Sequence, residues 1–129
     1  MKKLLSVFSL VCTLFINQSL KAQTMEKDVT IIELTQTENQ FETQELKLTS
    51  GKYQFRIVNK NVDKDLGFLI RKEEDKNSSS METVIPNSFT AALVKKEKVQ
   101  YTGIVELKKG KYVYTCPLNP TPHYQLIVK

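Results

Sequence analysis

The stretch of sequence that decides the fold lies near the end of the chain, at residues 110–124, GKYVYTCPLNPTPHY. Its first half alternates, so Tyr112, Tyr114 and Cys116 share one side of an extended strand. Its second half contains three prolines, which lack an amide donor and fix their own φ, so neither a ladder nor a helix fits there. An apolar run restarts a strand after His123. The stretch therefore predicts two strands joined by a stiff loop, with a thiol at one end and an imidazole at the other.

The first 22 residues have the composition of an export leader. Two lysines open the chain, an apolar run follows, and Ala22 offers a small residue for cleavage. The apolar run is too short and wrongly flanked to span a membrane. We therefore expect a signal peptide at 1–22 and a single domain at 23–129. The protein is then exported to the periplasm or the extracellular space, with no membrane span once the leader is removed.

Composition argues against several classes of function. The leader carries three of the 19 basic residues and no acid, so most of the net charge of +5 leaves with it. The remaining charge gives no reason to expect nucleic-acid binding. With one histidine there is no Ser/His/Asp arrangement for hydrolysis, and the sequence has no glycine-rich phosphate loop. We therefore do not expect an enzyme.

Short apolar runs between turn residues predict an all-β protein. The clearest run is 53–59, where aromatic or aliphatic residues alternate with polar ones. Residues 99–107 also alternate, which predicts that the odd-numbered residues of this run lie on one face. The other expected strands are 29–34, 41–48, 66–71, 89–94, 112–116 and 124–128, with a turn of helix within 81–86. Seven or eight strands with little helix predict a Greek-key β-sandwich.

Two segments, 48–55 and 107–114, share the pattern Leu-x-x-Gly-Lys-Tyr-x-aromatic. Each predicts the end of a strand, a turn that needs glycine, and a new strand led by a tyrosine. Two copies are too few for a solenoid but fit a sandwich that uses half of a Greek key twice. We expect Tyr53, Tyr112 or Tyr114 to hydrogen-bond back to the backbone at a corner of the sandwich.

The two residues at the ends of the proline loop have more than one interpretation. Cys116 is the only cysteine beyond the leader, so it cannot form an internal disulfide. It is a buried inert thiol, an intermolecular partner or a ligand. His123 is either a ligand or a loop imidazole bonded to backbone carbonyls.

With these residues in view, the chain resembles the cupredoxins, the blue copper proteins such as plastocyanin and azurin. The pattern GxYxYxCP at 110–117 resembles their cysteine strand, and 53–59 resembles the strand that leads to their first histidine. The resemblance implies a rigid sandwich in which two imidazoles and a thiolate hold copper, with a weak axial ligand. It also implies electron transfer or copper carriage, with a redox or copper-exchange protein as partner.

Carried over residue by residue, the resemblance assigns the metal to Cys116 and His123. The slot of the first histidine falls on Lys64, or one register later on Gly67, and neither binds copper at neutral pH. Asn119 occupies the early slot of the loop, where the alternative is an amide that braces the loop between its prolines. Only two of four ligand positions therefore hold strong donors, which suits Cu(I) better than Cu(II).

Three hypotheses follow from this incomplete set of ligands. The first is a copper-binding protein in which Cys116 and His123 are joined by another donor: Asp65, Asp63, Met81, Met25 or a side chain of a partner protein. The second is a metal-free β-sandwich that serves as an interaction module. The third is a reactive-thiol protein, in which the ammonium of Lys64 favours the thiolate of Cys116.

Overall fold

The computed structural model describes residues 28–119 and 121–129, so the expected leader at 1–22 lies outside the described residues. Within them the chain forms eight strands and two short 3-10 helices, which confirms the prediction of an all-β protein. None of the helices described is long and apolar enough to cross a membrane. The strands are β1 (Val29–Thr37), β2 (Gln40–Phe41), β3 (Glu45–Leu48), β4 (Gly51–Asn59), β5 (Leu69–Lys72), β6 (Val99–Leu107), β7 (Gly110–Thr115) and β8 (Tyr124–Val128). The helices are η1 (Glu73–Asp75) and η2 (Met81–Thr83).

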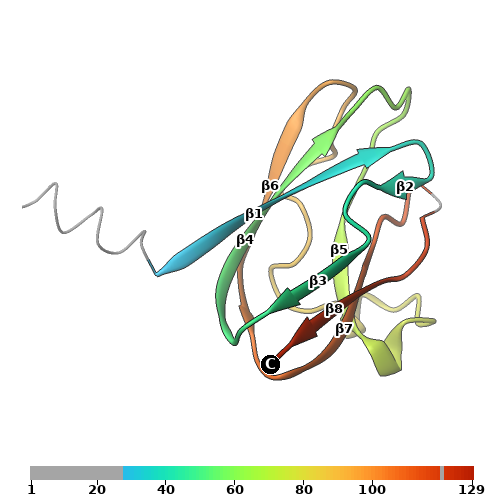
Figure 1. Ribbon diagram of the computed structural model, residues 1–129. Coiled ribbons are helices and arrows are strands. Elements are labelled where there is room, and N and C mark those ends of the chain that lie inside the picture. The colour runs from blue at the N-terminus through green and yellow to red at the C-terminus, as the bar shows by residue number, and fades with distance from the viewer. Residues whose placement is uncertain (1–27, 120) are drawn as a thin grey trace, which may run out of the picture.

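The strands form two four-stranded sheets that face each other as a sandwich (Figure 1). One sheet has the order β2-β1-β4-β6 and the other the order β3-β8-β7-β5. Two neighbouring pairs are parallel, β1 with β4 and β3 with β8, and the other pairs are antiparallel. The chain therefore passes repeatedly from one sheet to the other, and residues distant in sequence meet in both layers.

An aromatic cluster fills the space between the sheets. Phe41 of β2 is fully buried, and its ring meets those of Tyr114, Tyr124 and Phe68 edge-to-face at centroid distances of 5.3, 5.7 and 5.9 Å. Such edge-to-face pairs add about 0.5–1.5 kcal/mol each beyond their buried area. Because Phe41 belongs to one sheet and Tyr114 to the other, the cluster joins the two layers.

The repeated Leu-x-x-Gly-Lys-Tyr pattern makes the same structure twice. The hydroxyl of Tyr53 donates to the carbonyl of Thr49 at 2.6 Å, and the hydroxyl of Tyr112 donates to the carbonyl of Lys108 at 2.8 Å. Each tyrosine thus bonds back across the turn that precedes its own strand. The predicted corner tyrosine is confirmed, and the fold has two of them.

The expected strand 41–48 is wrong as a single element. Phe41 belongs to β2 of the first sheet, whereas Leu46 and Leu48 belong to β3 of the second. The physical reason is parity, because an odd-numbered and an even-numbered residue on one straight strand point to opposite faces. All three contribute to the core only because the chain changes sheets between them.

The expected strand 89–94 is also wrong. This segment makes only isolated bridges, Thr90 with Thr102 and Val94 with Leu66, and its Phe89 and Leu93 side chains are about half exposed. Leu66 likewise lies outside the strand predicted for it, since β5 begins at Leu69. The turn of helix expected within 81–86 is confirmed by η2.

The odd-numbered residues of β6 do not share one face. The register between β4 and β6 shifts at Gln54/Arg56, so Val105 is buried while Tyr101 is 42% exposed. At the shift the backbone amide of Phe55 donates to the hydroxyl of Thr102 at 3.0 Å, and this side chain takes the place of a backbone acceptor. Such a bulge reverses the faces of the residues beyond it.

Tyr114 makes the stability of the fold depend on pH. Its hydroxyl donates to the carbonyl of Thr43 at 2.6 Å, and burial raises the pKa of Tyr114 above the ordinary value of 10.0. The folded protein then keeps a proton that the unfolded chain loses, so this contribution to stability is complete below about pH 10 and is lost as the pH rises further. We expect Tyr114→Phe to lower the free energy of unfolding by about 1 kcal/mol at neutral pH, because the hydrogen bond is lost.

The same substitution should reduce the decline of stability in alkali. Urea denaturation of wild type and Tyr114→Phe at neutral pH and at about pH 11 measures both effects. An equally steep alkaline decline in the two proteins would contradict the assignment to Tyr114.

Candidate functional site

Cys116 lies directly after β7 and, as the alternation predicted, on the same side as Tyr112 and Tyr114, which is the inner side of the sheet. It is 3% exposed, and its sulfur accepts two backbone hydrogen bonds. One comes from the amide of Gly67 at 3.3 Å and the other from the amide of Asn119 at 3.2 Å. The thiol is thus held between the segment before β5 and the loop that joins β7 to β8.

A closed set of hydrogen bonds, which we call the thiol circuit, surrounds this sulfur. The side-chain amide of Asn119 donates to Oε1 of Gln36 at 3.2 Å, and Nε2 of Gln36 donates to the carbonyl of Gly67 at 2.8 Å. Together with the two bonds to Cys116, these contacts return to their starting point. Gln36 and Asn119 are both fully buried. The circuit therefore ties β1 of one sheet to the loop after β7 of the other.

Asn119 makes further bonds to the turn between β1 and β2. Its Nδ2 also donates to the carbonyl of Thr37 at 3.0 Å, and its Oδ1 accepts from the backbone amide of Asn39 at 2.8 Å. Both ends of the side-chain amide are therefore engaged within the protein. In this structure Asn119 braces the loop, which was the alternative to a ligand role.

A threonine fixes the ends of the proline loop. The hydroxyl of Thr121 accepts from the backbone amide of Cys116 at 3.1 Å and lies 2.9 Å from the hydroxyl of Thr115. His123 follows, exposed to solvent, and the next residue, Tyr124, is buried at the start of β8. The imidazole is therefore on the surface and the thiol in the interior. The structure joins Cys116 to Asn119 and Gly67, but it does not bring an imidazole into the thiol circuit.

Two residues were candidates for the position of the first cupredoxin histidine, Lys64 and, one register later, Gly67. Lys64 is exposed, and only its backbone carbonyl is held, by Nδ2 of Asn59 at 3.1 Å. The upstream residue that contacts the sulfur is Gly67, through its amide. Met25, one of the possible additional ligands, lies outside the described residues.

The other possible ligands lie on the surface with their own partners. Asp65 pairs with Lys95 at 3.7 Å, and Asp63 pairs with Lys96 at 2.6 Å. Met81 lies in η2 and is 64% exposed. None of the three is among the hydrogen-bond partners found for the sulfur in the described part of the chain.

The residues around the thiol do not fit a type 1 copper site, which needs two imidazoles and a thiolate in one plane. Residues 28–119 and 121–129 hold no group of three or more His, Cys, Asp and Glu side chains that could bind a metal ion. One buried side-chain oxygen there has no hydrogen-bond partner, Oγ1 of Thr37, and a hydroxyl is a poor ligand for copper.

Sequence reasoning missed Gln36, the acceptor and donor at the centre of the circuit. A signal was present, because Ile32, Leu34 and Gln36 follow the two-residue period of one strand face. A glutamine at a core position of a strand must find internal partners for its amide. The expected strand stopped at residue 34, so this glutamine was not recognised as buried.

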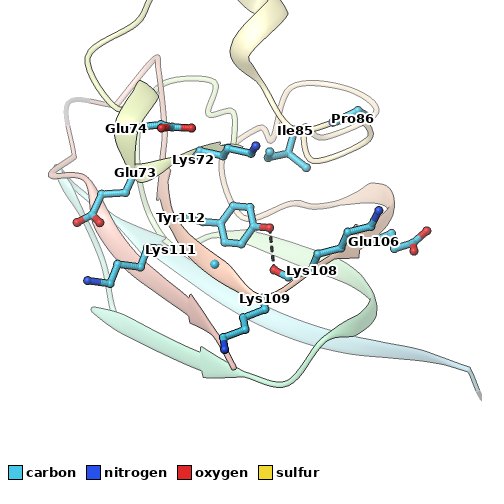
Figure 2. A pocket seen from close by; sticks show the side chains of 11 residues that line it. Lys72, Glu73, Glu74, Ile85, Pro86, Glu106, Lys108, Lys109, Lys111 and Tyr112 are labelled. Carbon is cyan, nitrogen blue, oxygen red and sulfur yellow. Dashed lines mark hydrogen bonds between the residues drawn. The ribbon is translucent and has the colours of Figure 1, made fainter.

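A separate hollow lies at the other end of β7. It has a volume of about 650 Å³ and surrounds Tyr112, with Ile85 and Pro86 beside it and a rim of lysines and glutamates (Figure 2). The hydroxyl of Tyr112 is already bonded to the carbonyl of Lys108. The hollow is open to solvent and does not include Cys116, so it is not part of the thiol site.

Loss of the Asn119 side chain should destabilise the protein measurably. Asn119→Ala leaves Oε1 of Gln36 and the amide of Asn39 without partners, and we expect the free energy of unfolding to fall by about 2–4 kcal/mol. Gln36→Ala breaks the same circuit, so the double variant should lose less than the sum of the two single losses.

Leu118→Ala is the matched control, since Leu118 is the neighbouring loop residue and is 46% exposed. It should change stability by at most about 0.5 kcal/mol. Urea denaturation of all four variants gives the values, and strictly additive losses for Asn119 and Gln36 would contradict the circuit.

Known proteins resemble this chain in structure but not in sequence. No protein-family model matches the sequence. No curated protein matches it either. Among solved structures, auracyanin A, a "blue" copper protein from the green thermophilic photosynthetic bacterium Chloroflexus aurantiacus, superposes with a TM-score of 0.62 at 16% identity and covers 78% of this chain and 99% of its own.

Two further auracyanins give the same result. The dithionite-reduced auracyanin of the photosynthetic bacterium Roseiflexus castenholzii has a TM-score of 0.59 at 14% identity, covering 78% of this chain and 97% of its own. Auracyanin B has a TM-score of 0.56 at 15% identity, covering 78% and 88%. Identities this low establish the fold alone. The resemblance seen in the sequence is confirmed at that level: this chain has the cupredoxin-like fold of the blue copper proteins.

Proposed function

We propose that this chain is an exported binding module with the cupredoxin-like fold that works without a type 1 copper ion. The observation that carries the proposal is the thiol circuit. In a blue copper site the side chains around the sulfur direct free donor atoms at the ion. Here the buried side chains of Gln36 and Asn119 use their donors and acceptors on each other and on the backbone.

The circuit also holds the two sheets together at this end of the sandwich, as a bound metal ion would. It joins Gln36 of one sheet to the loop of Cys116 and Asn119 in the other, so the loop keeps its shape without an ion. Because the described residues hold no group of three or more side chains that could bind a metal ion, we assign the function to the surface. Export rests on the leader at 1–22, as argued from its sequence.

Copper titration tests this proposal directly. We expect purified protein, freed of the leader, to show no intense visible band with Cu(II). We also expect no shift in melting temperature with either Cu(II) or Cu(I), because a ligand stabilises only a folded state that binds it. Cys116→Ser should behave like wild type. A coloured complex, or stoichiometric copper binding that disappears in Cys116→Ser, would overturn the proposal.

A second candidate is copper carriage through Cys116 and His123, with a copper-exchange or redox protein as partner. What favours it is the fold, together with the exposed Pro117 and Leu118 beside the thiol, which offer a partner an apolar contact. It requires the loop to rearrange, because the imidazole is exposed and the sulfur is buried.

A competition assay with a Cu(I) chelator separates the two candidates. Carriage predicts that His123→Ala and Cys116→Ser each weaken Cu(I) binding at least about tenfold, since each removes one of two ligands. Lys64→Ala should leave the affinity unchanged, as an exposed residue of the upstream slot. Equal binding by wild type and His123→Ala would exclude a two-ligand site.

A reactive-thiol role requires a sulfur that reagents can reach. At 3% exposure, with its two hydrogen-bond donors both backbone amides, Cys116 has the surroundings of a structural thiol. The exposed ammonium of Lys64 is not one of those donors. The structure therefore favours the binding module over this alternative.

A further inference from the structure

One edge of the first sheet carries a strand with a free side. β1 pairs with β4 from Val29 to Gln36, whereas β2 covers only Gln36 and Thr37 on the other side. Among the described residues, no strand pairs with that side of β1 before Gln36. Figure 1 shows this part of β1 extending beyond β2 along the side of the sandwich.

Two hydrogen bonds identify which backbone groups face the free side. The carbonyl of Thr35 accepts from Glu42 on the β2 side, and the carbonyl of Gln36 accepts from Lys60, which follows β4. The amide and carbonyl of one residue point the same way, and the direction alternates along a strand. Val29, Ile31 and Glu33 therefore direct three amides and three carbonyls away from β4.

Between Val29 and Thr35 this edge has no lysine, proline or bulge. Natural edges carry lysine, proline or a bulge, or are covered by a loop. Between Val29 and Thr35 the only charge is Glu33, which is ion-paired with Arg56 of its own sheet. Ile31 is 57% exposed at the centre of this stretch, and Ile104, in the same cross-strand row, is 50% exposed.

We propose that β1 pairs with β1 of a second copy of this chain, antiparallel, with the two-fold axis at Ile31. The edge is self-complementary in this register, because the residues whose amides and carbonyls face the free side are spaced symmetrically about Ile31. These residues are Val29, Ile31 and Glu33. The partner's Ile31 then lies opposite Ile31, and the partner's Glu33 lies opposite Val29. The six free backbone groups of each copy, twelve in the pair, are all satisfied by six hydrogen bonds. A shift of the axis to Ile32 would place Val29 opposite Thr35, whose carbonyl already accepts from the amide of Glu42.

A second copy fits better than an unrelated peptide because one surface supplies both halves of the contact. The pairing also brings two exposed isoleucines together and makes one continuous sheet from two. The inference does not rest on the proposed function. It is tested by measuring whether two copies of the chain associate, and that measurement involves neither copper nor the thiol.

Ile31→Pro is the variant that tests the edge. Proline removes the amide of residue 31, which faces the free side, so no bond to β4 is lost and the fold is retained. We expect wild type to shift from monomer to dimer with rising concentration in sedimentation velocity, and Ile31→Pro to remain monomeric. Ile104→Thr is the control: it removes an exposed isoleucine from the same face but from β6, at the opposite edge of the sheet, and it should still dimerise.

Cysteine cross-linking tests the register. In the proposed pair the two residues at position 31 have Cα atoms about 5.5 Å apart, within the range for a disulfide. We expect Ile31→Cys to form a covalent dimer on mild oxidation. Glu33→Cys should not, because its two copies lie about 13 Å apart along the strands.

Several outcomes would overturn the proposal. If wild type stays monomeric at every concentration, β1 does not pair with a second copy. The free edge would then suit a strand of another protein. A dimer lost in Ile104→Thr but kept in Ile31→Pro would place the contact on the sheet face. Equal cross-linking of the two cysteine variants would exclude this register, and growth beyond a dimer would exclude a closed two-fold pair.

Discussion

Polar groups that are removed from water must find partners inside the protein, and this requirement shapes the end of the sandwich that holds the thiol. The amides of Gln36 and Asn119 have no access to solvent. Leaving either unpaired would cost about 1–3 kcal/mol, a substantial part of the stability of a small domain. The loop after β7 therefore takes the one shape that places Asn119 against β1. Prolines and Thr121 limit the alternatives, and Cys116 is carried into the interior as an acceptor.

The rest of the fold supports this arrangement. The corner tyrosines, Tyr53 and Tyr112, each bond back across the turn that begins their strand, while the thiol circuit lies beyond the far end of β7. Between them, the rings around Phe41 join the layers. A cupredoxin-like sandwich can thus be held at both ends by hydrogen bonds. The copper ion of the blue copper proteins is not required to explain how this chain is held together.

Local patterns in the sequence predicted the fold class, the strand at 53–59 and the shared side of Tyr112, Tyr114 and Cys116. Those features depend on neighbours within a few residues. The features that were missed depend on distant partners. The bulge in β6 exists because Thr102 replaces a backbone acceptor for Phe55, and Gln36 meets Asn119 across 83 positions of sequence. Likewise, the nearness of Cys116 and His123 in sequence did not reveal that one side chain is buried and the other exposed.

The position of β8 has a consequence for how the chain folds. β8 lies inside its sheet, between β3 and β7, and pairs in parallel with residues 45–48. The second layer therefore cannot close until residues 124–128 have met residues 45–48, because β8 lies between β3 and β7. Contacts between segments so far apart also form slowly. Completion of this layer is therefore slower than the pairing of neighbours such as β7 with β8.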